Sequence, residues 1–191
     1  MNFYDKQADT AIYYNKLPHW RQDTVCYFVT FRTADSLPQS KLEYWHKERE
    51  KWLAEHPEPR SKKETIEYHK KFSNRMEYWL DQGYGKCILK DESIRQIVTD
   101  SLISYADQRY RLWEYTISVN HVHLLIEPIE NKQLSKIMRS LKSYTAKCIN
   151  ERTGQSGAFW QKDYFDHIVR SEEQLHKFIK YIRCHNKAAI L

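Results

Sequence analysis

The chain lacks a long hydrophobic run, and none of its apolar segments approaches the roughly 20 residues that a membrane-spanning helix needs. Its first residues, 1–6, also lack the apolar core of a signal peptide. Cysteine occurs at four scattered positions (Cys26, Cys87, Cys148 and Cys184) without a C-x-x-C pair, so we expect small buried side chains rather than disulfides. These absences predict a cytoplasmic protein that makes no membrane contact.

The composition supplies a hydrophobic core and an excess of positive charge. Hydrophobic residues make up 41% of the 191 residues and aromatic residues 14%, which argues against disorder. A chain of this length can bury the core of one domain. Its 31 Lys and Arg against 25 Asp and Glu leave a formal net charge of +6, which favours a polyanionic partner without identifying one.

Glycine is absent between residues 39 and 80, and this stretch is dense in charge. Pro57 and Pro59 divide it into two predicted helices, so we expect a charged helical insertion at about 39–82. The predicted helices are 40–56, 61–80, 91–109, 133–151 and one that begins at Ser171, and the predicted strands are 25–32, 112–118, 121–127 and 164–169. This order predicts a single α+β domain over 1–191, with an antiparallel sheet and helices packed on it.

Two histidines separated by one apolar residue are the first candidate for chemistry. His121 and His123 lie in a predicted strand, where alternate side chains share a face, so both imidazoles can hold one cation from the same side. Taken alone, this pattern is not rare in strands, so a histidine pair that binds no metal is the alternative. Zinc hydrolases of the TIM-barrel type are excluded by length, since such barrels need about 250 residues. Leu125 at the next alternate position excludes a histidine-triad transferase.

A tyrosine on the last predicted helix is the candidate nucleophile. His185 follows Tyr181 by four residues, so the two side chains share a helix face. If this helix packs beside the histidine strand, His185 completes a three-ligand site with Tyr181 over the metal. A phenol is a poor nucleophile because its pKa is about 10, and a metal that polarises a phosphodiester compensates for this. The alternatives are a surface tyrosine, one of fourteen, and a histidine that complements the helix dipole.

Several blocks resemble the REP-associated tyrosine transposases, a branch of the single-tyrosine HUH endonucleases within the IS200-like transposases. The blocks lie at 17–20, 27–32, 120–126, 134–137, 141–146, 156–161, 163–170 and 181–182. They include the runs Asn-His-Val-His-Leu-Leu-Ile, Phe-Trp-Gln and Tyr-Ile. The resemblance covers roughly 13–37 and 86–190 and leaves the charged insertion outside.

The resemblance implies a ferredoxin-like α+β fold with both histidines on a central strand. It also implies a divalent ion, Mg²⁺ or Mn²⁺, held by His121 and His123. Tyr181 would attack single-stranded DNA near a hairpin, leaving a 5′-phosphotyrosine and a free 3′-OH. The nearest alternatives are a replication initiator or relaxase with the same site, and a hairpin-binding protein that does not cut.

The third metal ligand departs from the pattern of the family. Relatives carry an amide one turn after the tyrosine, in Tyr-Ile-x-Asn-Asn-Pro, whereas this chain has His185 at that position, Asn186 next to it and no proline. Either side chain can be the ligand, and a histidine favours borderline ions such as Mn²⁺.

Contacts with DNA phosphates are expected on the basic face of helix 133–151 and near the loop 153–163. The apolar face of this helix includes Tyr144 and Cys148, and the cations are expected outside it. The candidate phosphate contacts are Lys136, Arg139, Lys142 and Arg170. A merely solvated face is the alternative. The chain is expected to be a monomer or a homodimer, with its site in one chain or completed by exchange of the tyrosine helix.

Overall fold

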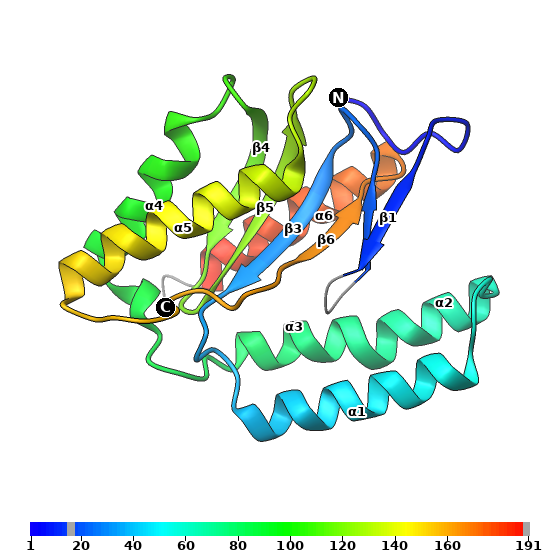
Figure 1. Cartoon of the computed structure of the whole chain (residues 1–191), viewed down its shortest axis with the longest axis horizontal. Helices are drawn as coiled ribbons and strands as arrows, with labels where there is room; N and C mark the ends of the chain where they lie inside the picture. Colours follow the sequence, from blue (N-terminus) through cyan, green and yellow to red (C-terminus); the bar gives the residue numbers. More distant parts are fainter. Residues whose placement is uncertain (15–17, 189–191) are drawn as a thin grey trace. The chain divides into compact units, whose positions relative to one another are not determined.

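The structure, a computed structural model, describes residues 1–14 and 18–188 (Figure 1). These residues form two compact units. The larger unit joins Met1–Ala34 to the chain from Ile88 onward, and the smaller unit is Asp35–Cys87. The smaller unit contains the segment that the sequence predicts as an insertion at about 39–82.

The larger unit is built on a four-stranded antiparallel sheet. The strand order is β4 (Tyr110–Ile117), β5 (His121–Pro128), β3 (Tyr27–Arg32) and β6 (Phe165–Ile168). Helices α4 (Glu92–Ser104) and α5 (Leu134–Thr153) cover one face, and α6 (Glu172–Ala188) lies behind the other face (Figure 1). The short helix η2 (Ile88–Lys90) precedes α4. This arrangement confirms the α+β prediction, and its strand order is that of a ferredoxin-like sheet.

The central strand β5 pairs with β3 on one side and with β4 on the other, and all eight of its residues are buried. Val122, Leu124 and Ile126 point into the core beneath α4 and α5. Because side chains alternate along a strand, His121 and His123 point to the opposite face, toward α6. A second apolar cluster there joins the sheet to α6 and includes Phe28, Leu125, Val169 and Ile182. The helix that carries Tyr181 is thereby held against the histidine strand.

Local signals account for the helix ends. The Asp91 carboxylate accepts from the backbone N–H groups of Ser93 and Ile94 and begins α4. The prediction that this helix extends to 109 is wrong, because Asp107 adopts a positive φ of 62° and β4 starts at Tyr110. Helix α5 ends at Gly154, whose φ of 66° suits a residue without Cβ.

The smaller unit is a helical hairpin. Its elements are α1 (Gln39–Glu55), α2 (Lys62–Tyr68), the π-helical η1 (His69–Ser73) and α3 (Asn74–Asp81). Trp45, Trp52 and Phe72 are buried between the two arms, and the Trp45 Nε1–H donates to the carbonyl oxygen of Phe72 at 3.2 Å. The predicted helices 40–56 and 61–80 are therefore present, although η1 interrupts the second one.

The structure also contains a separate hairpin of β1 (Ala11–Tyr14) and β2 (Pro18–Arg21), which the sequence pattern did not predict. Part of the block at 17–20 lies outside the described residues. The prediction of buried cysteines is correct for Cys26 and wrong for Cys184, which is exposed.

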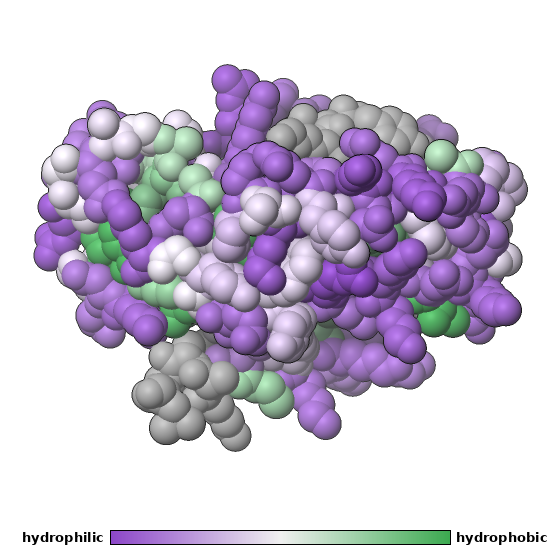
Figure 2. All heavy atoms as spheres, turned by 90° about the horizontal axis from the view of Figure 1, so that it is seen from below, coloured by the Kyte–Doolittle hydropathy of each residue, from purple (hydrophilic) through white to green (hydrophobic). Residues whose placement is uncertain are grey.

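The surface seen in Figure 2 is mostly hydrophilic, and hydrophobic residues reach it in small separate groups. Tyr144 belongs to the exposed residues and not to the apolar face of α5, because 53% of its surface is accessible. In the described part of the chain, no helix has the length and apolar character that crossing a membrane requires.

Candidate functional site

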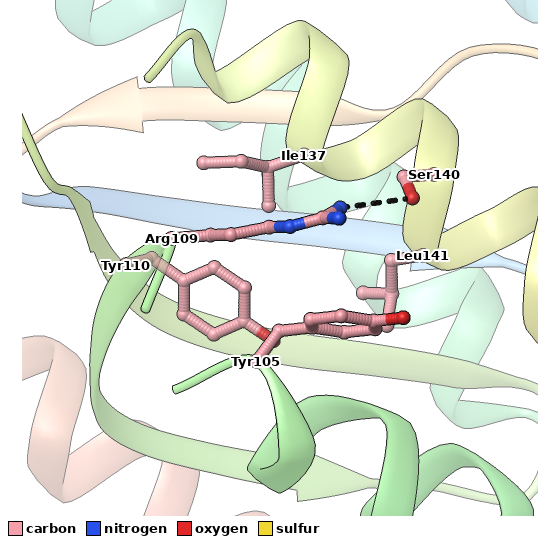
Figure 3. A pocket seen from close by; sticks show the side chains of 6 residues that line it. All are labelled: Tyr105, Arg109, Tyr110, Ile137, Ser140 and Leu141. Carbon is pink, nitrogen blue, oxygen red and sulfur yellow. Dashed lines mark hydrogen bonds between the residues drawn. The ribbon is translucent and has the colours of Figure 1, made fainter. Parts of the chain in front are cut away.

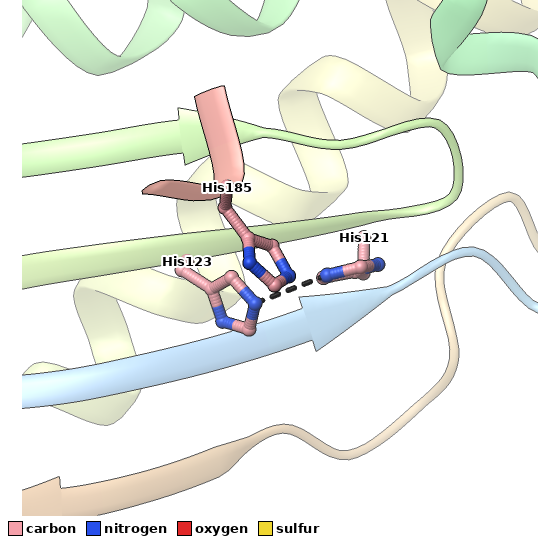
Figure 4. A group of neighbouring side chains, drawn as sticks. All are labelled: His121, His123 and His185. Atoms are coloured by element: carbon pink, nitrogen blue, oxygen red, sulfur yellow. Dashed lines mark hydrogen bonds between the residues drawn. The ribbon is translucent and has the colours of Figure 1, made fainter. Parts of the chain in front are cut away.

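Three histidines meet between β5 and α6 (Figure 4). The Nε2 atoms of His121 and His123 lie 3.0 Å apart, and the ligand atoms of these two residues and His185 all lie within 4.8 Å of one another. His121 and His123 are fully buried by the sheet and α6, whereas His185 is half-buried. The structure thus brings together the three histidines that the sequence predicts as ligands, and the side chain of Asn186 lies outside the described residues.

Each strand histidine is oriented through its other ring nitrogen. Nδ1 of His121 lies 2.8 Å from Oδ1 of the buried Asn120, and Nδ1 of His123 lies 2.8 Å from the Thr30 hydroxyl. An amide oxygen only accepts, so Nδ1 of His121 carries a proton and its Nε2 keeps a lone pair. The Thr30 hydroxyl can accept from Nδ1 of His123 in the same way. With the proton on Nδ1, the Nε2 atom of each ring carries a lone pair and can act as a ligand.

Electrostatics keep the inner histidine neutral. Burial lowers the pKa of His123 well below its ordinary value, and neighbouring His121 and His185 lower it further. A neutral imidazole is the form that binds a metal. Two nitrogen ligands that each lie about 2.1 Å from one ion, at right angles, are about 3.0 Å apart. The observed separation of the two Nε2 atoms therefore fits a divalent cation.

The Tyr181 hydroxyl lies 3.5 Å from Nε2 of His123, within the same chain. The Tyr181 ring also packs against His185, with centroids 4.7 Å apart, because the two residues are one turn apart on α6. Phe28 on β3 holds this helix in place by stacking on Phe178. Their ring centroids lie 4.4 Å apart, and the angle between the ring planes is 4°. The helix therefore brings a phenol beside the paired imidazoles without a second chain.

Three further residues near the site have roles that the sequence pattern did not predict. Thr30 and Asn120 orient the histidines, as described above. Arg32 is the register partner of His121 on β3, so both side chains leave the sheet on the same face. Burial lowers the pKa of Arg32 to about 10, which leaves it charged at neutral pH. Strand register was the signal that could have identified Thr30 and Arg32, but pairing partners are not visible in one sequence.

The expectation that Lys142 lies outside the apolar face of α5 is wrong. Its side chain is buried, and its ammonium group donates to the carbonyl oxygens of Gln161, Lys162 and Asp163 at 2.7, 2.9 and 3.2 Å. Desolvation lowers its pKa to about 8. This lysine therefore fastens the loop before β6 to α5.

The other predicted phosphate contacts, Lys136, Arg139 and Arg170, are exposed. Lys136 and Arg139 belong to α5, which lies on the face of the sheet opposite to the histidines (Figure 1). Their distance from the histidine site in the fold means that they can meet only DNA that extends beyond that site.

A buried cluster of ionisable groups lies between β2 and β6. Nδ1 of His19 is 2.9 Å from the Asp166 carboxylate, and Nε2 of His19 is 3.1 Å from the Asp163 carboxylate. Burial raises the pKa of Asp166, and its hydrogen bond to His19 opposes this rise. Because one ring joins two strands of separate sheets, the cluster is a structural clamp that the sequence pattern did not reveal.

A shallow pocket between α4, β4 and α5 is separate from the histidine site (Figure 3). Arg109 extends across it, donates to the Ser140 hydroxyl at 3.3 Å and lies 4.3 Å from the centroid of the Tyr105 ring. This pocket is on the face covered by α5, whereas the paired histidines are on the other face. The chain's own guanidinium group spans the pocket, and no catalytic side chain lines it.

The fold and the site together define a class: an antiparallel α+β domain with a His-x-His pair on its central strand and a tyrosine on its last helix. The family model for IS200-like transposases matches residues 82–185, which is more than half of the chain and includes all three histidines and Tyr181. This protein belongs to the IS200-like transposase family, whose members process DNA.

Two solved structures are similar at low sequence identity. A REP-associated tyrosine transposase bound to a REP hairpin has 12% identity and a TM-score of 0.47, and the match covers 88% of this chain and 70% of that one. A protein from Deinococcus radiodurans R1 described as a transposase has 12% identity and a TM-score of 0.36. This match covers 97% of this chain and 98% of that one. No curated protein matches the chain. The family assignment rests on the family model alone.

Proposed function

We propose that this protein is a metal-dependent endonuclease and strand transferase that acts on single-stranded DNA beside a hairpin. The observation that carries the proposal is the Tyr181 hydroxyl 3.5 Å from Nε2 of His123, which is itself 3.0 Å from Nε2 of His121. A hydroxyl that can act as a nucleophile and two nitrogens that can bind a metal thus lie next to one another. Membership of a transposase family supports DNA as the substrate.

His121, His123 and His185 would hold Mg²⁺ or Mn²⁺, and the ion when bound would polarise a phosphodiester for attack. Three nitrogen donors favour Mn²⁺ over Mg²⁺, which prefers oxygen ligands. Asn120 and Thr30 keep the Nε2 atoms directed at the ion.

In the reaction, the Tyr181 oxygen forms a bond to phosphorus as the bond from phosphorus to the 3′ oxygen breaks. The phenolic proton is lost to solvent or to a nearby base, and the 3′ oxygen leaves as a hydroxyl after it gains a proton. The product is a 5′-phosphotyrosine, which conserves the energy of the broken ester for rejoining to another 3′-OH. Positioning of the phenol by α6 supplies the in-line geometry.

The rest of the chain would hold the flanking DNA. Lys136 and Arg139 on α5 and Arg170 after β6 are exposed cations that suit backbone phosphates. The Tyr181 hydroxyl lies beside His123 of the same chain, which supports a site completed in a monomer over one completed by exchange of the tyrosine helix in a homodimer. We propose that the reaction takes place in the cytoplasm.

The test is incubation of the protein with Mn²⁺ and a pool of labelled hairpin oligonucleotides that carry random single-stranded arms. The wild type is expected to give a covalent adduct on a denaturing gel, and a chelator should abolish it. Tyr181→Phe should bind DNA without forming the adduct. The exposed Tyr144, changed to Phe, is the matched control and should retain the adduct.

Two outcomes would contradict the proposal. An adduct in Tyr181→Phe means that another residue is the nucleophile. Hairpin binding that survives a chelator, with no adduct in the wild type, supports instead a DNA-binding protein that does not cut. A relaxase-type nuclease is the weaker alternative because the family model is that of transposases.

A further inference from the structure

One buried carboxylate holds two exposed side chains at the β4 edge of the sheet. Glu127 on β5 is 3% exposed, and its Oε2 accepts from the Trp113 Nε1–H at 2.9 Å. Its Oε1 lies 3.8 Å from Nη1 of Arg111. Trp113 itself is 43% exposed, and the Arg111 side chain is 60% exposed. The carboxylate is therefore covered, and the indole and the guanidinium group face outward.

A β-bulge gives Trp113 this orientation. Leu112 pairs with Ile126 and Glu114 pairs with Leu125, so Trp113 is an extra residue between two consecutive pairs. Bulges redirect a side chain, and here the bulge brings the indole N–H to Glu127. A hydrogen bond to a buried carboxylate fixes the ring plane, so the exposed part of the ring is a preformed aromatic surface.

A second, half-buried carboxylate extends this surface toward α6. Glu114, next to Trp113, accepts from Nε of Arg183 at 2.7 Å. The Glu114 side chain is 20% exposed and that of Arg183 is 69% exposed, so again the cation is outermost. Arg183 lies on α6 between Tyr181 and His185. The outward face of Arg111, Trp113 and Arg183 is therefore cationic and aromatic, and Arg183 lies two residues from both Tyr181 and His185. We name these three residues the β4 surface.

We propose that Trp113 is a stacking platform for an unpaired nucleobase of the strand that enters the site, with Arg111 and Arg183 against the neighbouring phosphates. Every base has a π-face that can stack on an indole, and two exposed guanidinium groups complement the phosphates on either side. Paired bases already stack on their neighbours, so the β4 surface selects single strands over duplex. This inference rests on the proposed function, because it assigns the occupant of the β4 surface as the strand that Tyr181 attacks.

The binding test uses a Tyr181→Phe background, in which cleavage does not interfere. The probe is a fluorescein-labelled 20-nucleotide single strand of random sequence, followed by fluorescence anisotropy, with a duplex of equal length beside it. Trp113→Leu should weaken single-strand binding by about 5- to 100-fold, the range expected for one stacked base, and leave duplex binding within about twofold. Trp113→Phe should retain most of the affinity because a ring remains.

The matched control is Trp20→Leu. Trp20 is 39% exposed and lies on β2, which contacts β6 at the opposite edge of the sheet, so its loss should change neither affinity. Equal affinities for Trp113→Leu and Trp20→Leu would overturn the proposal. An equal loss of affinity for single strand and duplex in Trp113→Leu would also overturn it. So would a Trp113→Phe variant that binds the single strand as weakly as Trp113→Leu does.

A second measurement does not depend on the stability of Trp113→Leu. Stacking quenches indole emission, so the single strand should reduce the tryptophan fluorescence of the wild type clearly more than that of Trp113→Phe. Identical quenching would refute stacking. The covalent adduct distinguishes this inference from the proposed function. If Tyr181 forms no adduct while the preference for single strands depends on Trp113, stacking on Trp113 is supported and the proposed nuclease activity is not.

Discussion

Replacement of Lys142 by methionine tests whether this buried cation holds the loop that leads into β6. The ammonium group donates to three carbonyl oxygens at 2.7 to 3.2 Å, and the residue is only 9% exposed. Methionine keeps most of the aliphatic stem and removes the donors. Because the three carbonyls come from consecutive residues, 161–163, loss of these hydrogen bonds would detach this turn from α5, while Gln161 remains bonded to Arg32 and Asp163 to His19.

The magnitude follows from two opposing contributions. Hydrogen bonds from a charged donor stabilise by about 1.5–3 kcal/mol each. Desolvation lowers the pKa of Lys142 from 10.5 to about 8, so burial of the charge offsets part of the stabilisation from these bonds. Removal of the donors leaves three carbonyl oxygens without this partner, at about 1–3 kcal/mol each, and relief of the desolvated charge returns part of that. Lys142→Met should therefore lower the free energy of unfolding by about 2–4 kcal/mol at pH 7.

The same pKa gives the direction of the pH dependence. Between about pH 8 and 10.5 the unfolded chain keeps the Lys142 proton while the folded protein has released it. The unfolded state then binds more protons, so stability from this group rises with pH, by up to about 1.4 kcal/mol per pH unit. Lys142→Met lacks this contribution, and the advantage of the wild type over the variant should therefore grow from pH 8 to 10.

The assay is urea denaturation of both proteins at several pH values. The control is Lys147→Met on the same helix, where the ammonium is 74% exposed and its ion pair with Glu151 is 3.9 Å long, so the change should stay within about 0.5 kcal/mol. A Lys142→Met variant as stable as this control would show that Lys142 does not stabilise the loop at 161–163. A difference in the free energy of unfolding between wild type and variant that stays constant from pH 8 to 10 would show that burial does not lower the pKa of Lys142.

Three other changes have expected outcomes. Gly85→Ala should destabilise the helical hairpin by about 2 kcal/mol or more in chemical denaturation. A Cβ at this position would lie 2.5 Å from the Asp35 carbonyl oxygen, and the φ of 88° is strained for any residue with a Cβ. Unchanged stability would contradict this close approach. Thr30→Val keeps the shape of the side chain and removes the partner of Nδ1 of His123, so the affinity for Mn²⁺ measured by calorimetry should fall about 10-fold or more. An affinity equal to that of the wild type would exclude this orienting role of Thr30. His19→Leu leaves two buried carboxylates without their shared donor and should cost about 3–5 kcal/mol at pH 7. That cost should shrink as the pH falls, because the carboxylates take up protons, and a cost independent of pH would show that they are not charged.

The elements that depend on local pattern were predictable. The strand β5 was predicted as 121–127 and observed as His121–Pro128, because its apolar residues alternate with the two histidines. Tyr181 and His185 share a helix face through their spacing of four. Both inferences follow from the fixed periods of strand and helix, and the core contacts of α6 then bring the two faces together.

The elements that depend on distant partners were not predictable from one sequence. Lys142 was assigned to the solvated face because a lysine among charged neighbours ordinarily lies there, whereas its partners are about 20 residues away in the chain. His19 meets its carboxylates across 144 and 147 residues. The bulge at Trp113 depends on its pairing with β5 and leaves no pattern in the strand itself.

The central claim is that α6 delivers the Tyr181 oxygen to a phosphodiester held beside the paired imidazoles. The most direct test is mass spectrometry of the covalent DNA adduct after nuclease trimming and digestion with trypsin. Trypsin cleaves after Lys180 and Arg183, so the fragment Tyr-Ile-Arg has one tyrosine and should carry the mass of the remaining nucleotide. A nucleotide on any other residue, or no modified peptide after incubation with Mn²⁺ and hairpin DNA, would contradict the account.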